Sequence, residues 1–209
     1  MSQEYKVKHL YSFIKRCFDI FCSFVAIIVL LPLLLILMVL VPLTSKGSPF
    51  YLDKRLGKNK KIIKVIKFRS MKSDARPVIE ILSKEQYKEY IKTFKLENDP
   101  RTTKFGRFLR KTSLDELPQL FNILKGDLSF VGPRPIVEKE YEYLWNNDEL
   151  IFKVRPGLTG YWAVNGRSNT SYEDRIKQED YYVAHRSLWL DFKILVKTFF
   201  VAISGKGAL

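Results

Sequence analysis

The sequence predicts an α+β fold, mostly helical, that is anchored in a membrane by its N-terminal segment. Residues 20–45 form an uncharged run with basic residues on both sides, and strand-like patterns in the rest of the 209-residue chain are few and short. Amphipathic stretches with helical spacing occupy most of the remainder. We therefore expect a membrane helix at residues 1–45. A cytoplasmic domain at residues 46–209 should hold one small β-hairpin and interfacial amphipathic helices.

The uncharged run carries a proline near its middle. As a straight helix its roughly 26 residues would cross a hydrocarbon core of about 30 Å, whereas a bend at Leu31 and Pro32 would leave two halves of about 16–18 Å each. Lys15 and Arg16 precede the run and Lys46 follows it, so the positive-inside tendency places both ends in the cytoplasm. This favours a monotopic, re-entrant helix. A spanning helix that tolerates its proline remains the alternative.

The chain is strongly basic. It has 36 Lys and Arg against 22 Asp and Glu, a net charge of +14, which suits anionic lipid head groups, nucleic acid or phosphorylated substrates. Nine of the basic residues lie between Lys54 and Lys72, just after the membrane run, and juxtamembrane cations favour adhesion to anionic lipids. Cys17 and Cys22 show neither disulfide nor metal-site spacing, and the two histidines lie too far apart in the sequence to suggest zinc.

The domain is expected to begin with a hairpin at residues 50–71 that turns near Gly57 and Asn59. Helices follow it. Ser83 and Gln86 have capping-box spacing before an apolar stripe, and Pro135 opens a later helix. The predicted helices are 83–94, 104–111, 115–125, 137–145, 172–185 and 187–204.

The last of these helices is unusually apolar and aromatic, with Asp191, Lys193 and Lys197 as its only charged residues. Such a helix can lie in the core or at a membrane interface, where Trp189 and Phe192 would reach the acyl boundary. The interfacial position is favoured.

The strongest chemical signal is the segment Ser113-Leu114-Asp115-Glu116-Leu117-Pro118. Proline is accepted in the first turn of a helix, so Pro118 places the acidic pair at a helix N-terminus. The macrodipole and the basic residues just upstream should keep both carboxylates ionised, as a nucleophile or a metal ligand requires. An ordinary capping box between Ser113 and Glu116 is the alternative.

Three arginines downstream lie in loops that Pro and Gly make rigid. Arg134 lies in Gly-Pro-Arg-Pro, Arg155 opens Arg-Pro-Gly-Leu-Thr-Gly, and Arg167 follows Asn-Gly. Fixed guanidinium groups suit bidentate recognition of phosphate, and the sequence has no Gly-rich nucleotide loop. Asp127, which follows Gly126, is a third carboxylate that could help to hold Mg²⁺ or could close the C-terminal turn of a helix.

These residues resemble a known family. The segment from Lys104 through Arg134 includes the acidic pair and most of the Gly-Pro-Arg-Pro loop. It is similar to bacterial sugar transferases, the monotopic phosphoglycosyl transferases that load a sugar phosphate onto polyprenyl phosphate. The resemblance covers nearly the whole chain and includes Lys15-Arg16 with Asp19, Lys67-Phe68-Arg69-Ser70-Met71, the Arg155 loop and Asn165-Gly166-Arg167. The chain departs from the family at Leu31-Pro32, where the family often has Ser-Pro.

The resemblance implies a mechanism at the cytoplasmic face of a bacterial inner membrane. Asp115 would attack the sugar-bearing phosphate of a UDP-sugar and expel UMP, and undecaprenyl phosphate would then accept the phosphosugar. Glu116 would bind Mg²⁺, with Asp127 as a further metal residue. Phosphate contacts would come from Lys67, Arg69, Arg110, Arg134, Arg155 and Arg167. The expected partners are both substrates and anionic lipids, but not nucleic acid; a homo-oligomer is compatible with the sequence.

Two other functions remain open from the residues alone. A basic, membrane-anchored adaptor for anionic lipid or nucleic acid would explain the charge, but not the acidic pair beside fixed arginines. A membrane hydrolase would use water in place of the lipid acceptor. The sequence does not name the sugar, although the ending 204–209 resembles endings in the glucose- or galactose-phosphate branch.

Overall fold

The computed structural model describes residues 8–72, 78–83, 87, 90, 99–144, 150–166 and 170–204, and it confirms a mostly helical chain with small sheets. The helices are α1 (His9–Thr44), α2 (Val78–Ile81), α4 (Lys104–Lys111), α5 (Gln119–Lys125), α6 (Glu138–Leu144), α7 (Tyr161–Val164), α8 (Tyr172–His185) and α9 (Leu188–Ser204). The strands are β1 (Phe50–Leu56), β2 (Ile62–Phe68), β3 (Ser129–Val131) and β4 (Gly157–Thr159). Short 3-10 turns are η1 (Lys58–Lys60), η2 (Leu114–Glu116) and η3 (Leu150–Lys153).

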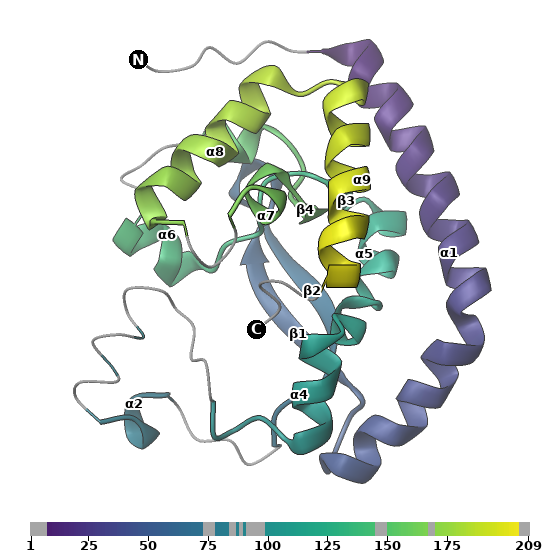
Figure 1. Cartoon of the computed structure of the whole chain (residues 1–209), viewed down its shortest axis with the longest axis vertical. Coiled ribbons are helices and arrows are strands. Elements are labelled where there is room, and N and C mark those ends of the chain that lie inside the picture. Colours follow the sequence, from purple (N-terminus) through teal and green to yellow (C-terminus); the bar gives the residue numbers. More distant parts are fainter. Residues whose placement is uncertain are drawn as a thin grey trace.

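α1 runs along one side of the molecule and curves around it toward α4 (Figure 1). Within the described residues it is the only helix long and apolar enough to cross a membrane. The sequence predicts a bend at Leu31 and Pro32, and α1 passes through both Pro32 and Pro42 as one continuous helix. Membrane helices tolerate proline when neighbouring groups satisfy the freed carbonyl. The re-entrant path through a bilayer therefore stays a prediction.

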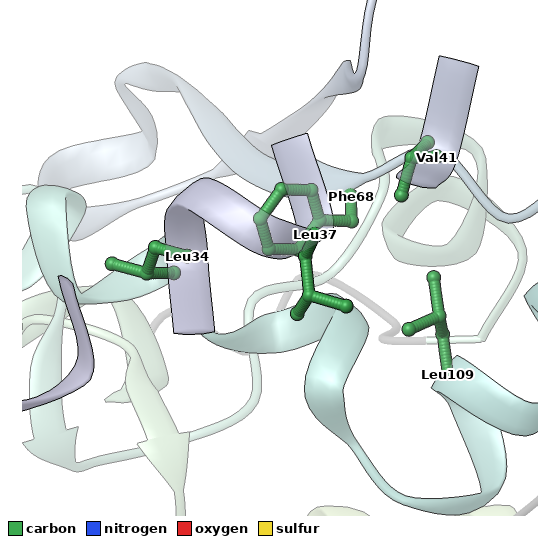
Figure 2. Packing of buried hydrophobic residues seen from close by; sticks show 5 residues of the cluster. All are labelled: Leu34, Leu37, Val41, Phe68 and Leu109. Atoms are coloured by element: carbon green, nitrogen blue, oxygen red, sulfur yellow. The ribbon is translucent and has the colours of Figure 1, made fainter. Parts of the chain in front are cut away.

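The C-terminal half of α1 is held to the domain by apolar packing. Leu34, Leu37 and Val41 are buried against Phe68 of β2 and Leu109 of α4 (Figure 2). Many other apolar side chains of α1 are exposed, and a patch of this kind marks a surface that meets lipid or protein. The domain thus holds α1 along one stripe and leaves much of its apolar surface uncovered.

β1 and β2 form the predicted antiparallel hairpin, with Phe50 opposite Phe68 and Leu56 opposite Ile62. The turn is η1, and Asn59 takes a left-handed conformation there with φ 56°. Alternate residues at the centre of β2 are buried against α5. The hairpin therefore uses one face of β2 to pack on the helix that follows the acidic pair.

β3 and β4 form a parallel pair that the sequence analysis does not predict. The two strands meet closely at glycines: a Cβ on Gly132 would lie 2.5 Å from the carbonyl oxygen of Arg155, and one on Gly157 would lie 2.1 Å from the Gly132 nitrogen. Each strand has only three residues. Both lie beside segments that the sequence marks as rigid loops, so the loops are rigid partly because they are paired.

The structure confirms several helix predictions. α4 and α8 match 104–111 and 172–185, and α9 begins one residue after the expected start at 187. The helix expected at 115–125 begins only at Gln119, because Pro118 occupies its N-cap position and the acidic pair lies in the separate turn η2. Most of the predicted helix 83–94 and Trp145 lie outside the described residues.

α9 lies beside the N-terminal half of α1 (Figure 1) and is joined to it through Asp191. The Asp191 carboxylate accepts hydrogen bonds from Lys15 Nζ at 2.7 Å and from Tyr11 at 2.8 Å. Ile194 is buried on the same helix. The exposed large apolar residues of α9 are Leu188, Trp189, Phe192, Val196, Phe199 and Phe200. This half-buried, aromatic helix is consistent with the predicted interfacial position.

Candidate active site

The acidic pair lies in η2, immediately before α5. Ser113 precedes the turn in a left-handed conformation with φ 56°, and its side chain makes no capping hydrogen bond. The capping-box alternative is therefore wrong. Because Pro118 is the N-cap of α5, Asp115 and Glu116 lie just before the helix and not within its first turn.

Asp115 is only 8% exposed. Burial, and then the charge of Glu116, raise the pKa of the Asp115 carboxyl to about 6, while Lys67 and Arg110 act in the opposite direction. The sequence predicts a fully ionised pair, because the nearby cations are visible in it and the burial is not. With this pKa about nine-tenths of Asp115 is ionised at pH 7. The carboxylate can therefore act as a nucleophile near neutral pH.

Glu116 is partly exposed and forms an ion pair with Lys67, whose Nζ lies 3.3 Å from Oε1. The two residues come from η2 and β2, and both line the same cavity. The predicted catalytic turn and a predicted phosphate-binding lysine are thus brought together.

This cavity, here called the Glu116 cavity, has about 510 Å³ of empty space that is partly open to solvent. Its walls come from the hairpin, η2 and α5, the ends of β3 and β4, α7 and α8. It unites three predicted site residues: Lys67, Glu116 and Arg134. The sequence analysis did not name as site residues five more polar or aromatic lining residues, which are Arg55, Gln119, Thr159, Trp162 and Glu179.

Arg134 and Glu179 form the buried side of the Glu116 cavity. The Arg134 guanidinium lies 5.6 Å from the centre of the Trp162 ring. The backbone N–H of Arg134 donates to Glu179 Oε1 at 3.0 Å, and burial raises the pKa of Glu179 to about 7. Among the described residues, neither Arg134 Nε nor Glu179 Oε2 has a hydrogen-bond partner. Such orphaned atoms at a cavity wall are suited to a polar ligand.

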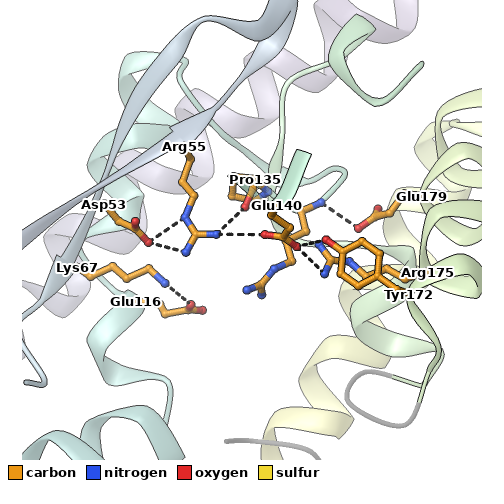
Figure 3. A network of polar contacts seen from close by, with 10 residues as sticks. Asp53, Arg55, Lys67, Glu116, Pro135, Glu140, Tyr172, Arg175 and Glu179 are labelled. Atoms are coloured by element: carbon orange, nitrogen blue, oxygen red, sulfur yellow. Dashed lines mark hydrogen bonds and ion pairs between the residues drawn. The ribbon is translucent and has the colours of Figure 1, made fainter. Parts of the chain in front are cut away.

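A network of buried charges fixes Arg55 at the same cavity (Figure 3). Glu140 accepts hydrogen bonds from Tyr172 and from Arg175, whose Nη1 lies 2.9 Å away, and Arg55 Nη1 lies 4.0 Å from the other oxygen of the Glu140 carboxylate. Arg55 also pairs with Asp53 at 2.7 Å. Asp53 and Arg55 are two residues apart on one strand of the predicted hairpin, which is a usable sequence signal that both face the same side.

Two further residues that the sequence predicts to bind phosphate are Arg110 and Arg69. Arg110 is close enough to Asp115 to lower its pKa, and it donates from Nε to Ser70 Oγ at 2.8 Å. Arg69 donates to the backbone carbonyl of Lys46 at 3.3 Å. Neither lines the Glu116 cavity.

The far end of α5 holds two more predicted site residues. Arg155 donates from Nε to the Gly126 carbonyl at 2.9 Å, and Asp127 accepts from Lys125 Nζ at 2.9 Å. The backbone of Asp127 closes the C-terminal turn of α5, and the seven residues of this helix span about 10 Å. The structure therefore does not bring Arg155 and Asp127 to the acidic pair, and Arg167 lies outside the described residues.

Of the two predicted metal residues, Glu116 lies next to Asp115 in η2, and Asp127 lies at the other end of α5. No group of three or more His, Cys, Asp or Glu side chains suited to a metal is found in the part of the chain that the structure describes. Mg²⁺ commonly binds through one or two carboxylates together with phosphate oxygens of a substrate. The acidic pair fits that arrangement, so the Mg²⁺ site stays a prediction centred on Glu116.

The chain is similar in sequence to several known proteins. The chain is 44% identical over 200 residues to the undecaprenyl-phosphate galactose phosphotransferase of Salmonella typhimurium. The alignment covers 94% of this chain and 42% of the Salmonella protein. It is 42% identical over 187 residues to the exopolysaccharide production protein ExoY of Sinorhizobium fredii, covering 88% of this chain and 83% of that one. It is 38% identical over 203 residues to the UDP-glucose:undecaprenyl-phosphate glucose-1-phosphate transferase of Escherichia coli. That alignment covers 93% of this chain and 41% of the Escherichia coli protein.

The chain spans about two fifths of the length of several of these relatives, and most of the length of ExoY. The similarity extends over α1 as well as the domain, since the model of one family matches residues 10–205. That model describes the bacterial sugar transferases, and this chain belongs to that family.

Proposed function

We propose that the chain transfers a sugar 1-phosphate from a UDP-sugar to undecaprenyl phosphate or a similar polyprenyl phosphate, with release of UMP. One observation carries the proposal: a buried, mostly ionised carboxylate, Asp115, is next in the chain to Glu116, which lines a partly open cavity together with Arg55, Lys67 and Arg134. The names of the relatives support the substrates, because they include transfer of galactose or glucose phosphate to undecaprenyl phosphate. A membrane adaptor without catalysis has no use for this arrangement.

The reaction would take place in two steps. An oxygen of the Asp115 carboxylate attacks the phosphorus that bears the sugar; a P–O bond forms and the P–O bond to UMP breaks, so UMP leaves with the electron pair. A phosphate oxygen of the polyprenyl phosphate then attacks the same phosphorus and releases the carboxylate. Splitting the transfer this way lets the two substrates use one site in turn.

The residues of the Glu116 cavity would position the charged donor. Phosphoryl transfer depends mainly on positioning and on stabilisation of negative charge. Lys67 and Arg55 are held there by carboxylates, and Arg134 presents an orphaned Nε. Mg²⁺, held by Glu116 beside Asp115, would neutralise diphosphate charge and stabilise the departing UMP.

The position of α1 in the membrane would bring the site close to its second substrate, the polyprenyl phosphate. With α1 re-entrant and both of its ends on the cytoplasmic side of the bacterial inner membrane, η2 would lie near the head-group level, where the phosphate of a polyprenyl lipid is found. The exposed apolar surfaces of α1 and α9 support this placement. Single cysteines introduced before Lys15 and after Lys46, in a background without Cys17 and Cys22, should react with an impermeant thiol reagent from the same side; reaction from opposite sides would restore a spanning helix.

The function is tested by mixing the detergent-solubilised chain with Mg²⁺, undecaprenyl phosphate and one UDP-sugar at a time, beginning with UDP-glucose and UDP-galactose. We expect UMP release together with a chloroform-soluble sugar product. UMP release without that product would identify a hydrolase, and no UMP with any common UDP-sugar would reject the proposal. With donor alone, mass spectrometry should find the phosphosugar mass on the peptide that contains Asp115.

A further inference from the structure

A second cavity lies beside the N-terminal part of α1. It has about 500 Å³ of empty space that is partly open to solvent. It shares the β3–β4 pair with the Glu116 cavity: Val131 lines this cavity, and the next residue, Gly132, lines the other. Arg155, one of the residues that the sequence predicts to contact phosphate, lines it, whereas Asp115, Glu116, Lys67 and Arg134 do not. We call it the α1 cavity.

The walls of the α1 cavity are strongly basic. Its charged lining residues are Lys15, Arg16, Asp19, Lys58, Lys153, Arg155 and Arg186. Six of these seven are cationic. The nearby carboxylate of Asp191 pairs with Lys15 at 2.7 Å. Arg16, Lys58 and Arg155 alone outnumber Asp19, the carboxylate that lines the wall. The surplus positive charge favours a ligand with negative charge.

Two of the arginines are held in place by backbone at the end of α5. Arg16 donates from Nη1 and Nη2 to the carbonyls of Ile123 and Leu124 at 2.7 and 2.8 Å. Arg155 donates from Nε to the Gly126 carbonyl at 2.9 Å. Two guanidinium groups of like charge are thus fixed around one helix end. Preorganised donors of this kind favour a phosphate, whose oxygens accept several hydrogen bonds at once.

The position of the cavity along α1 points to the source of that phosphate. The lining residues on α1 lie between Tyr11 and Asp19, and the uncharged run begins at the next residue, Ile20. The cavity therefore lies where the helix changes from charged to apolar, which is the level of lipid head groups in a bilayer. Basic pockets at that level commonly bind anionic lipids.

We propose that the α1 cavity binds the phosphate of an anionic phospholipid head group, at a place separate from the acidic pair. The lipid would neutralise the surplus charge around Arg16 and Arg155 and fix the first turns of α1 against the domain. This inference needs the attachment of α1 to a membrane, but it does not need the proposed transferase reaction.

The test is native mass spectrometry of the full chain in detergent, titrated with phosphatidylglycerol and, separately, with phosphatidylcholine, inorganic phosphate and undecaprenyl phosphate. The variant K58E/K153E reverses two exposed lysines of the cavity wall, and K64E/K139E reverses two exposed lysines that line neither cavity. We expect one preferred phosphatidylglycerol, bound at least about tenfold more weakly by K58E/K153E and unchanged in K64E/K139E.

Equal weakening in the two variants, or no preference for phosphatidylglycerol over phosphatidylcholine, would overturn the proposal. So would binding of inorganic phosphate alone, or a stronger preference for undecaprenyl phosphate that K58E/K153E abolishes. If K58E/K153E lowers the unfolding temperature, Lys58→Gln with Lys153→Gln takes its place and should weaken lipid binding in the same direction. Asp115→Asn separates the two proposals, because it should bind phosphatidylglycerol like the wild type whether or not the chain is a transferase.

Discussion

Two of the buried aspartates, Asp19 and Asp115, differ in their surroundings. Asp19 of α1 is 1% exposed and accepts hydrogen bonds from the Ser129 hydroxyl and the Phe130 backbone N–H, both at 3.1 Å. Asp115 is 8% exposed, its own backbone N–H supplies a donor, and burial raises its pKa to about 6. Fixed donors from β3 make Asp19 a structural link between α1 and the domain. Asp115 keeps a charge that is less fully compensated, and this leaves it available to react.

The largest expected effect is a loss of turnover on substitution of Asp115 that substitution of Asp19 does not cause. Asp115→Asn should lower turnover of UDP-sugar by roughly 10³-fold or more, because an amide cannot form the acyl phosphate. Asp19→Asn should retain most of the turnover, since the amide oxygen can still accept from Ser129 and Phe130. Both variants are measured by UMP release at saturating Mg²⁺. An active Asp115→Asn would remove this residue from the nucleophile role and would make the two aspartates equivalent.

The second prediction concerns stability. The pKa of Asp115 is higher in the folded chain than the ordinary value, so the ionised carboxylate destabilises the fold; the penalty is absent below about pH 4 and complete above about pH 6. A shift from 3.8 to about 6 corresponds to roughly 3 kcal/mol. Asp115→Asn should therefore unfold at a higher temperature than the wild type at pH 7.

This gain should shrink as the pH falls and should vanish near pH 4, where both side chains are uncharged. Thermal unfolding in detergent from pH 4 to 8 checks it. A difference between variant and wild type that does not change with pH would mean that packing, and not the charge, sets the stability of this site. An inactive but more stable variant is the expected signature of a residue kept for reaction.

The third prediction tests the structural aspartate. Asp19→Ala should lower the free energy of unfolding by about 2 kcal/mol, because it leaves the buried Ser129 hydroxyl and Phe130 N–H without an acceptor. Asp19→Asn should recover most of the loss. Chemical denaturation in detergent measures both variants. Equal losses for Ala and Asn would show that the charge near Lys15 and Arg16, rather than the hydrogen bonds, stabilises this contact.

Local sequence signals predict several elements of this fold. The helix at 104–111 and the hairpin turn near Asn59 have short-range patterns, and the structure confirms them. Pro118 correctly separates the acidic pair from the interior of α5. Each of these features depends on residues within one or two turns of one another, so a single sequence is enough to reveal them.

The remaining features depend on contacts between distant segments. β3 and β4 are three residues each, and only their pairing shows that they are strands. Glu179 reaches the Glu116 cavity from α8, and nothing in its own helix indicates that role. The burial that raises the pKa of Asp115 also comes from the tertiary fold. Nearness in sequence can mislead as well: Asp127 lies only eleven residues after Glu116, yet α5 places it at the opposite end.

The smallest expected effect is that of Asp127→Asn, which tests whether Asp127 is separated from the acidic pair by the length of α5. Asp127 pairs with Lys125, an exposed residue, and also lies 3.4 Å from the Asn122 amide, so Asp127→Asn should change the free energy of unfolding by only about 0.5 kcal/mol. Turnover and the Mg²⁺ concentration for half-maximal activity should stay within about twofold of the wild type, whereas Glu116→Gln should raise that concentration by roughly tenfold or more. A matching loss of Mg²⁺ affinity in Asp127→Asn would return this residue to the metal site. It would also mean that the end of α5 approaches the acidic pair when the donor binds.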